Sequence, residues 1–122
     1  MVKGDIKYSS QVLIAEGTAA ETIEKGDIIV NTGGGWVVAD AVTLATSNVI
    51  GVAFEDADVL DNLSVFRSGV IEVEKASGIA AVDGELVEVS SGVVWRGQTD
   101  TANASIINDA EAADITAWIR IW

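Results

Sequence analysis

The sequence predicts an all-β domain, and three observations support this class. Apolar residues alternate with polar ones at a period of two far more often than at 3.6, Val, Ile and Thr are abundant, and Gly, Asn, Asp or Ser stands between most of the apolar runs. These patterns are typical of half-buried strands joined by short turns. With 122 residues, 49% of them hydrophobic, the chain is expected to fold as one domain around its own core.

Nine strands are predicted, in order along the chain. They run over residues 11–15, 27–31, 36–40, 48–54, 63–67, 70–75, 85–90, 93–96 and 116–122. Each combines β-branched or aromatic residues with two-residue alternation, and short turns separate most of them.

Helix is predicted to be limited to one or two short turns at most. Only "TAAETIEKG" carries helix signals, with Thr18 as a cap, Glu21 three residues later and Gly26 as a stop. A turn-rich approach to the next strand is the alternative interpretation of this stretch, because two turns of isolated helix are marginal.

The glycines of "NTGGGWVV", residues 31–38, allow two interpretations. Their bare backbone amides could cradle an anion, but such a loop needs a helix start after the glycines, together with Lys and Ser or Thr. Here the glycines lead into "WVVAD", which reads as a strand. We therefore predict a hairpin turn at this position.

The sequence also resembles itself. "KGDIIVNTGGGWVVAD" (25–40) aligns with "DGELVEVSSGVVWRGQ" (83–98) at an offset of 58 residues. More weakly, Ile50 and "EDAD" (55–58) align with Ile106 and "EAAD" (111–114) at an offset of 56, and "LSVFR" aligns with "TAWIR" at an offset of 53. Two copies are too few for a solenoid. We predict a small β-barrel or sandwich built from two pseudo-repeated hairpin units, at about residues 25–67 and 83–120.

Residues 1–15 are predicted to form an N-terminal arm and first strand, ahead of a single β domain over residues 16–122. The opening "MVKGDIKYSS" is polar, and a frayed terminus is the usual state of such a segment. The alternative is an arm that orders as an added strand on a partner, with contacts from apolar residues on alternate positions. The candidate contact residues are Ile6, Tyr8, Val12 and Ile14.

Composition excludes several chemistries. The chain contains no Cys, His or Pro, so a thiolate nucleophile, a Ser-His-Asp triad and the usual zinc sites are ruled out. Paired carboxylates could still hydrolyse glycosides, but Glu72 and Glu74 stand in an alternation typical of a strand with one wet face. We predict no enzymatic activity, catalytic residue, metal site or cofactor.

Charge excludes further partners. Nineteen acidic against seven basic residues give a net charge of −12, whereas proteins that bind nucleic acids or anionic membranes need the opposite sign. No stretch approaches the roughly 20 apolar residues of a membrane span. We expect a soluble protein made without a secretion signal, with no nucleic acid, membrane or small-molecule substrate as partner.

The stretch "FEDADVLDN" holds the densest group of acids, Glu55, Asp56, Asp58 and Asp61. A Ca²⁺ loop needs oxygens at alternating positions, a glycine for the sharp turn and a closing bidentate Glu. This stretch contains no Gly. A solvated loop between two strands is therefore the favoured interpretation.

The segment "ITAWIRIW" shows the sharpest alternation in the chain. As a strand it places Trp118, Arg120 and Trp122 on one face and Ala117, Ile119 and Ile121 on the other. Either face could point inward. If the first is exposed, its two indoles and guanidinium would suit a subunit contact, where Trp and Arg are enriched, or a sugar. These three residues and Trp36 form the candidate subunit interface.

The run "VIGVAFEDADVLDNLSVFRSGVIEVEKASGIAAVDGELVEVSSG", preceded by "GDIIV", resembles the small capsid decoration, or cement, proteins of tailed bacteriophages. The shared elements are an "IGVA" strand, an acidic loop, a strand ending in "SGV", then "EVEKASG" and a "DGELVEV" hairpin, over about residues 25–92. In outline the chain is also similar to lambda-type head-stabilising proteins, in which a "VGI" strand is followed by "FYKSG", here "VFRSG" at 65–69.

This resemblance implies an all-β, commonly trimeric protein on the outer surface of an expanded phage head, where it clamps neighbouring subunits of the major capsid protein. In lambda-type relatives an N-terminal arm adds a strand to the shell protein, although this chain has no proline-rich arm. The expected protein is a structural component of the virion, made in the host cytoplasm. Its acidity fits the outer face, because packaged DNA would repel it.

Two questions remain open: how copies of the chain would contact one another, and whether the protein binds a capsid or a carbohydrate. Three copies of a chain of charge −12 would carry −36 together, so the subunit contacts of a homotrimer must be apolar or bridged by arginine. The alternative to a decoration protein is a β-sandwich binding module, for example for carbohydrate, that uses exposed tryptophans.

Overall fold

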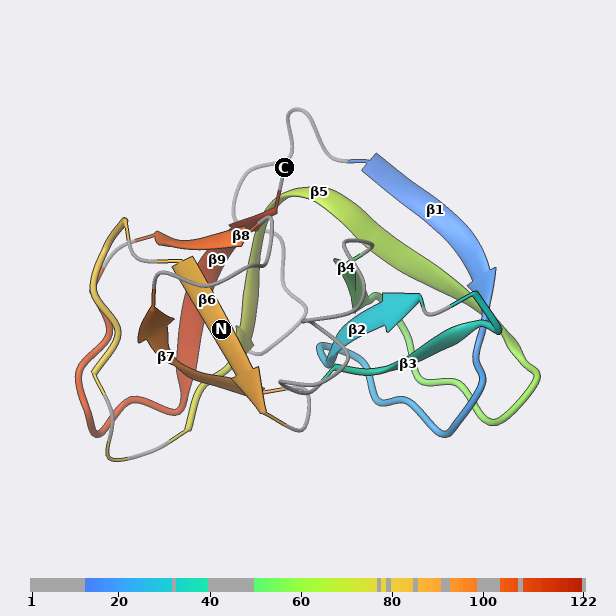
Figure 1. The fold of residues 1–122 in the computed structure, drawn as a ribbon, viewed down its shortest axis with the longest axis horizontal. Helices are drawn as coiled ribbons and strands as arrows, with labels where there is room; N and C mark the ends of the chain where they lie inside the picture. The colour runs from blue at the N-terminus through green and yellow to red at the C-terminus, as the bar shows by residue number, and fades with distance from the viewer. Residues whose placement is uncertain are drawn as a thin grey trace.

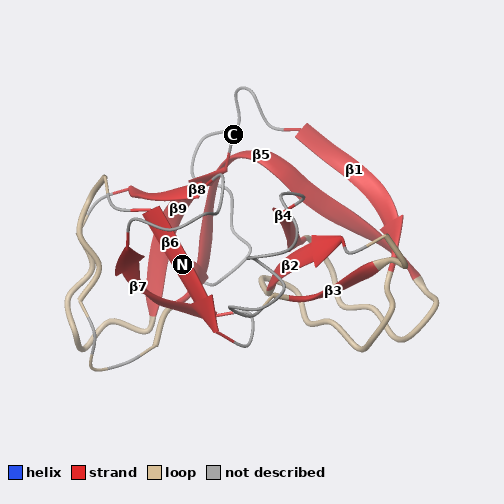
Figure 2. Cartoon of the chain, in the orientation of Figure 1, coloured by secondary structure: helices blue, strands red, loops and turns tan. Residues whose placement is uncertain are grey.

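The structure, a computed structural model, describes residues 13–31, 33–39, 50–76, 78, 80–84, 86–90, 93–98, 104–107 and 109–121. These residues contain nine strands and no helix, so the predicted all-β class is confirmed (Figure 2). The strands are β1 (Leu13–Thr18), β2 (Ile28–Asn31), β3 (Trp36–Val38), β4 (Ile50–Ala53), β5 (Asn62–Glu74), β6 (Leu86–Ser90), β7 (Val93–Gln98), β8 (Ala104–Ile107) and β9 (Thr116–Ile121).

All neighbouring strands pair antiparallel, in the order β3-β2-β4-β5-β9-β8-β6-β7, and β1 pairs with β5 outside this path. Of the two predicted architectures the barrel is not formed, because the described sheet does not close. The first part of β5 pairs with β1 and β4, and its second part pairs with β9. Figure 1 shows β5 arching from one group of strands to the other. We call β1 to β4 with the first part of β5 the N-terminal half, and the remainder the C-terminal half.

The predicted break between the strands at 63–67 and 70–75 is wrong, and other predicted strand ends differ from the structure by a few residues. The strands expected at 63–67 and 70–75 are one continuous strand, β5, in which Gly69 has a φ of +125°. Glycine adopts this conformation without steric cost, so the strand can bend there while its pairing passes from β1 and β4 to β9. Sequence reasoning also missed β8, whose residues "ASII" do not alternate between apolar and polar.

The stretch "TAAETIEKG" is a turn-rich approach to β2 and not a helix. Ala19 forms a bridge to Trp36, and Ile23 exchanges both backbone hydrogen bonds with Ala57, each at 2.8–2.9 Å. These partners lie far away in the sequence, so tertiary pairing overrides the local helix signals. The glycine turn is a hairpin as predicted, since β2 and β3 pair across it with Asn31 opposite Trp36.

The two halves contain equivalent backbone hydrogen bonds. Ala81 and Ala110 exchange the same pair of bonds as Ile23 and Ala57, at offsets of 58 (23 to 81) and 53 (57 to 110) residues. These are two of the offsets at which the sequence resembles itself, whereas the alignment of "EDAD" with "EAAD" at an offset of 56 is wrong, because Ala57 corresponds to Ala110. Strand pairing repeats as well, because β2 pairs with β3 and β4 as β6 pairs with β7 and β8. The internal similarity of the sequence therefore corresponds to a duplicated pattern of strands and bridges.

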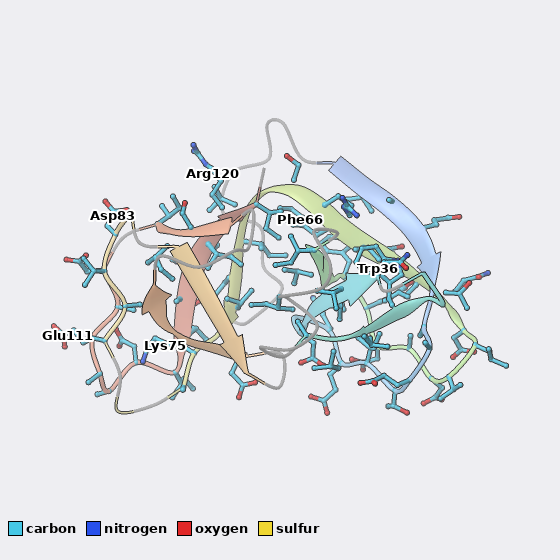
Figure 3. The ribbon with its side chains drawn as sticks, in the orientation of Figure 1. Trp36, Phe66, Lys75, Asp83, Glu111 and Arg120 are labelled. Atoms are coloured by element: carbon cyan, nitrogen blue, oxygen red, sulfur yellow. The ribbon has the colours of Figure 1, made fainter. Side chains whose placement is uncertain are left out.

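The hydrophobic core consists of two clusters. The larger contains residues of both halves, such as Ile28 and Phe66 from the first and Ile71, Ile106 and Ile119 from the second. A smaller cluster around Trp36 belongs to the N-terminal half. Figure 3 shows Phe66 between the two groups of strands. Because the larger cluster includes side chains from both halves, neither half can bury its apolar surface alone.

Candidate functional site

The acidic loop after β4 ties the turns of the N-terminal half together. The backbone N–H of Lys25 donates to Asp56 Oδ1 at 2.7 Å, and the N–H of Ser64 donates to Glu55 Oε1 at 2.9 Å. The N–H of Asp83 donates to Asp109 Oδ1 at 2.8 Å, which is the equivalent bond in the C-terminal half. These carboxylates satisfy backbone donors that would otherwise have no partner in the turns.

Three further aspartates close the turns in which they lie. Asp27, Asp61 and Asp114 each accept a hydrogen bond from the backbone N–H three residues earlier, at 3.0, 3.1 and 2.8 Å. No group of three or more acidic side chains in the described segments is arranged to hold a metal ion. Of the acids of "FEDADVLDN", Asp56 and Asp61 thus accept hydrogen bonds from turn N–H groups and Glu55 accepts one from β5, consistent with the favoured loop interpretation.

Strand β9 buries its aliphatic face. Ala117, Ile119 and Ile121 are at most 3% exposed, whereas Trp118 is half-buried and Arg120 is exposed. Figure 3 shows the Arg120 side chain pointing away from the ribbon. Of the two orientations that the alternation allowed, the aromatic and cationic face therefore points outward. Trp122 lies outside the described residues.

Trp36 occupies a different place from the subunit contact that was predicted. Its side chain is only 4% exposed, within the smaller core cluster, and the guanidinium of Arg67 lies 5.5 Å from the centre of its ring. Gly17 packs so closely that a side chain there would collide with the indole. Residues of its own chain cover this tryptophan, so it is not available to a second subunit.

One of the four proposed arm residues is described. Ile14 lies in β1, opposite Phe66 of β5, and is 44% exposed. Ile6, Tyr8 and Val12 fall outside the described residues. Ile14 is therefore an exposed apolar residue on a strand that pairs with β5 alone among the described strands.

A polar pocket of about 240 Å³ opens on the outward face of the C-terminal half. Glu72 of β5 lies directly opposite Trp118 of β9, and both residues line the pocket together with Thr116, Asp109 and Asp114. Residues opposite each other on antiparallel strands share one face of the sheet. The pocket thus combines an indole with three carboxylates.

Glu72 is the unusual member of this pocket. Its side chain is only 5% exposed, Oε2 accepts a hydrogen bond from Thr116 Oγ1 at 2.6 Å, and the buried Oε1 has no hydrogen-bond partner among the described residues. A buried carboxylate oxygen without a donor is costly and uncommon. Sequence reasoning assigned Glu72 to a wet strand face, and no local signal reveals its burial, since Trp118 stands 46 positions later in the sequence.

A second hollow, of about 280 Å³, lies between the turn before β2 and the loop after β4. Its acidic lining consists of Glu24, Asp56, Asp58 and Asp61. Two of these carboxylates already accept backbone hydrogen bonds, as described above. In the pocket at Glu72 all three carboxylates also accept a hydrogen bond within the chain, and that pocket differs by the buried Glu72 Oε1, which has no partner among the described residues.

No model of a protein family matches the chain, and no curated protein matches it. Within the described segments there is no helix long and apolar enough to cross a membrane. A functional proposal must therefore rest on the composition, the fold and the surface of this chain.

Proposed function

We propose that this protein is a structural virion component, a decoration or cement protein that binds the outer surface of an expanded phage head. In this role it stabilises the head by clamping neighbouring subunits of the major capsid protein, and it carries out no reaction. The proposal starts from the resemblance of residues 25–92 to such proteins. The features described below support it.

The single observation that carries the proposal is that strand β9 turns its Trp118 and Arg120 face outward. The hydrogen bonds that acidic side chains make to backbone N–H groups add to it, because they hold the loops of the domain in place. Trp118 and Arg120 point outward, and Trp and Arg are the residue types most enriched at protein contacts. Most of the described aspartates serve turns, which suits a rigid binding scaffold better than a catalytic cleft. We therefore assign the function to surfaces that bind neighbouring proteins.

The N-terminal arm is the proposed contact with the shell. It leads into β1, which pairs with β5 alone among the described strands and exposes Ile14. An extended segment can add a strand to a partner's sheet and gain affinity from main-chain hydrogen bonds. If the protein is a homotrimer, three tethered arms bind far more tightly than one, because the later contacts are intramolecular.

Co-sedimentation with purified phage heads tests this function. Full-length protein is mixed with expanded heads that lack it and, as a control, with unexpanded heads of the same phage. We expect saturable binding to expanded heads only, and weaker binding after removal of residues 1–10 with the circular dichroism spectrum unchanged. Absence of binding to either form rejects the decoration role. If the truncated protein binds expanded heads as tightly as the full-length protein, the N-terminal arm is not the contact with the shell.

One observation favours the alternative of a carbohydrate-binding module. Trp118 lines a polar pocket, and an indole beside carboxylates can stack on a sugar ring and accept hydrogen bonds from its hydroxyls. Binding on a glycan array that disappears in Trp118→Ala, together with no binding to heads, would favour this alternative. The high negative charge of the chain equally suits neutral sugars and basic protein surfaces.

A further inference from the structure

We propose that the pocket at Glu72 is a receptor for the guanidinium of Arg120 from a second copy of this chain. The proposal rests on the self-association that is part of the proposed function, and it specifies the contact that joins the copies. Three features carry it: an unsatisfied buried carboxylate, the composition of the pocket, and the position of Arg120.

The buried carboxylate calls for a compensating positive group. Among the residues that the structure describes, no donor reaches Glu72 Oε1, and the only described bond of the side chain is the one from Thr116 to Oε2. No ion pair joins Glu72 to Arg120 of the same chain, although their β-strands are neighbours. A cation in the pocket would lie near this carboxylate, and Coulomb attraction acts between the two charges even without direct contact.

The lining of the pocket fits a guanidinium better than an ammonium group or a metal ion. A planar guanidinium stacks on an indole and donates to carboxylates through several N–H groups at once. Trp118 lines the pocket with its indole, and Asp109 and Asp114 line it together with Glu72; each of these two aspartates already accepts one backbone hydrogen bond. The acids do not converge on a metal site. A volume of about 240 Å³ accommodates the end of an arginine side chain.

Arg120 is placed to act as the ligand for a neighbouring copy. It is exposed and stands opposite Val70, two residues along β9 from Trp118, so the donor and the pocket share one face of the sheet. Each copy therefore presents one guanidinium and one receptor side by side. In a cyclic assembly the Arg120 of every copy enters the pocket of one neighbour, and its own pocket binds the Arg120 of the other neighbour. All pockets are then occupied when the ring closes.

Charge makes this contact decisive for assembly. Copies of a chain with net charge −12 repel each other, and only seven basic residues are available to offset the repulsion. Among the basic side chains that the structure describes, Arg67 lies over Trp36 and Lys75 is 2% exposed. Arg120 and Lys25 are the exposed ones, and Lys25 lies in the other half of the molecule.

The test measures self-association of the full chain by sedimentation velocity over a range of concentrations. Arg120→Ala and Glu72→Gln are compared with Lys25→Ala, which removes the same charge as Arg120→Ala from an exposed site elsewhere. We expect each of the first two variants to weaken self-association about tenfold or more and Lys25→Ala to leave it within about twofold. Circular dichroism and urea unfolding verify that each variant is folded.

A mixing experiment keeps the test decisive if one variant is poorly folded. The Arg120→Ala variant retains an intact pocket, and the Glu72→Gln variant retains its guanidinium. An equimolar mixture should therefore associate more tightly than either variant alone, which a loss of stability would not produce. A wild-type chain that is monomeric at all concentrations, or an Arg120→Ala variant that associates like Lys25→Ala, overturns the proposal.

Binding to heads separates this inference from the proposed function. A chain that associates through Arg120 but ignores expanded heads supports the contact and rejects the decoration role. A chain that binds heads while its self-association is insensitive to Arg120 and Glu72 supports the decoration role and rejects the contact.

Discussion

The backbone N–H of Lys25 donates a hydrogen bond to Asp56 Oδ1 at 2.7 Å, joining the turn before β2 to the loop after β4. The same bond joins Asp83 to Asp109 at 2.8 Å in the C-terminal half. A long-range bond between two loops restrains both, and its presence in each half identifies it as part of the duplicated framework. It also offers a matched pair of sites at which to measure one interaction twice.

Asp56→Ala should lower the free energy of unfolding by about 1–2 kcal/mol, because it leaves the N–H of Lys25 without its acceptor. Asp109→Ala should have a similar effect through Asp83. Asp58→Ala is the control, since it removes the same charge from the same loop and its carboxylate makes no described hydrogen bond. Urea unfolding measures all three. If Asp58→Ala lowers the free energy of unfolding by the same amount, the effect comes from the change in net charge and not from the hydrogen bond.

Leu60 has a φ of +71° and is 78% exposed, in a turn that resembles those where Gly26 and Gly84 have φ near +90°. A side chain in this conformation costs about 1–2 kcal/mol. Leu60→Gly should therefore be more stable than Leu60→Ala by up to about 1 kcal/mol, because both lose the leucine but only alanine keeps the strained β-carbon. Thermal unfolding of the two variants makes the comparison. The opposite order would show that the turn relaxes without cost.

Gly17→Ala should destabilise the N-terminal half, because a β-carbon there would collide with the Trp36 indole. Overpacking of this kind costs about 1–3 kcal/mol. Gly34→Ala is the control, since its added β-carbon would meet nothing within 4 Å and Gly34 lies in the nearby hairpin turn. Urea midpoints followed by circular dichroism distinguish them. Equal midpoints would mean that Trp36 moves aside freely.

Thr116→Val should lower stability by about 1.5–3 kcal/mol, because it removes the donor to Glu72 Oε2 and leaves the buried carboxylate with no described partner. In a Glu72→Met background the same change should cost much less, since no buried charge remains to be satisfied. The double-mutant cycle gives a coupling energy of about 1–2 kcal/mol. A coupling near zero would mean that water already solvates this carboxylate.

Much of the fold can be predicted from local patterns, because they reflect contacts that repeat along the chain. The two-residue alternation predicted most strands, and the offsets of 58 and 53 residues recur between the bridges of Ile23 to Ala57 and of Ala81 to Ala110, which the sequence analysis did not predict. The division of β5 into two strands failed at Gly69, where a residue that usually interrupts strands instead lets one strand bend. Sequence alone cannot separate these two uses of glycine.

The candidate site was harder to predict, because its properties depend on distant pairings. The alternation of β9 defined its two faces, but only the packing of Ile119 and Ile121 into the core decides which one is outward. Trp36 was expected at the surface, yet Gly17 and Arg67 from two other strands cover it. Glu72 became notable only when the register placed it opposite Trp118.

The thirteen residues of β5 have a consequence for how the molecule responds to force and heat. Because one uninterrupted segment supplies a central strand to both groups of strands, damage at either end of it is transmitted to the other. The molecule should therefore melt in a single cooperative transition and bear load as one body. A clamp that spans two moving neighbours would need that property.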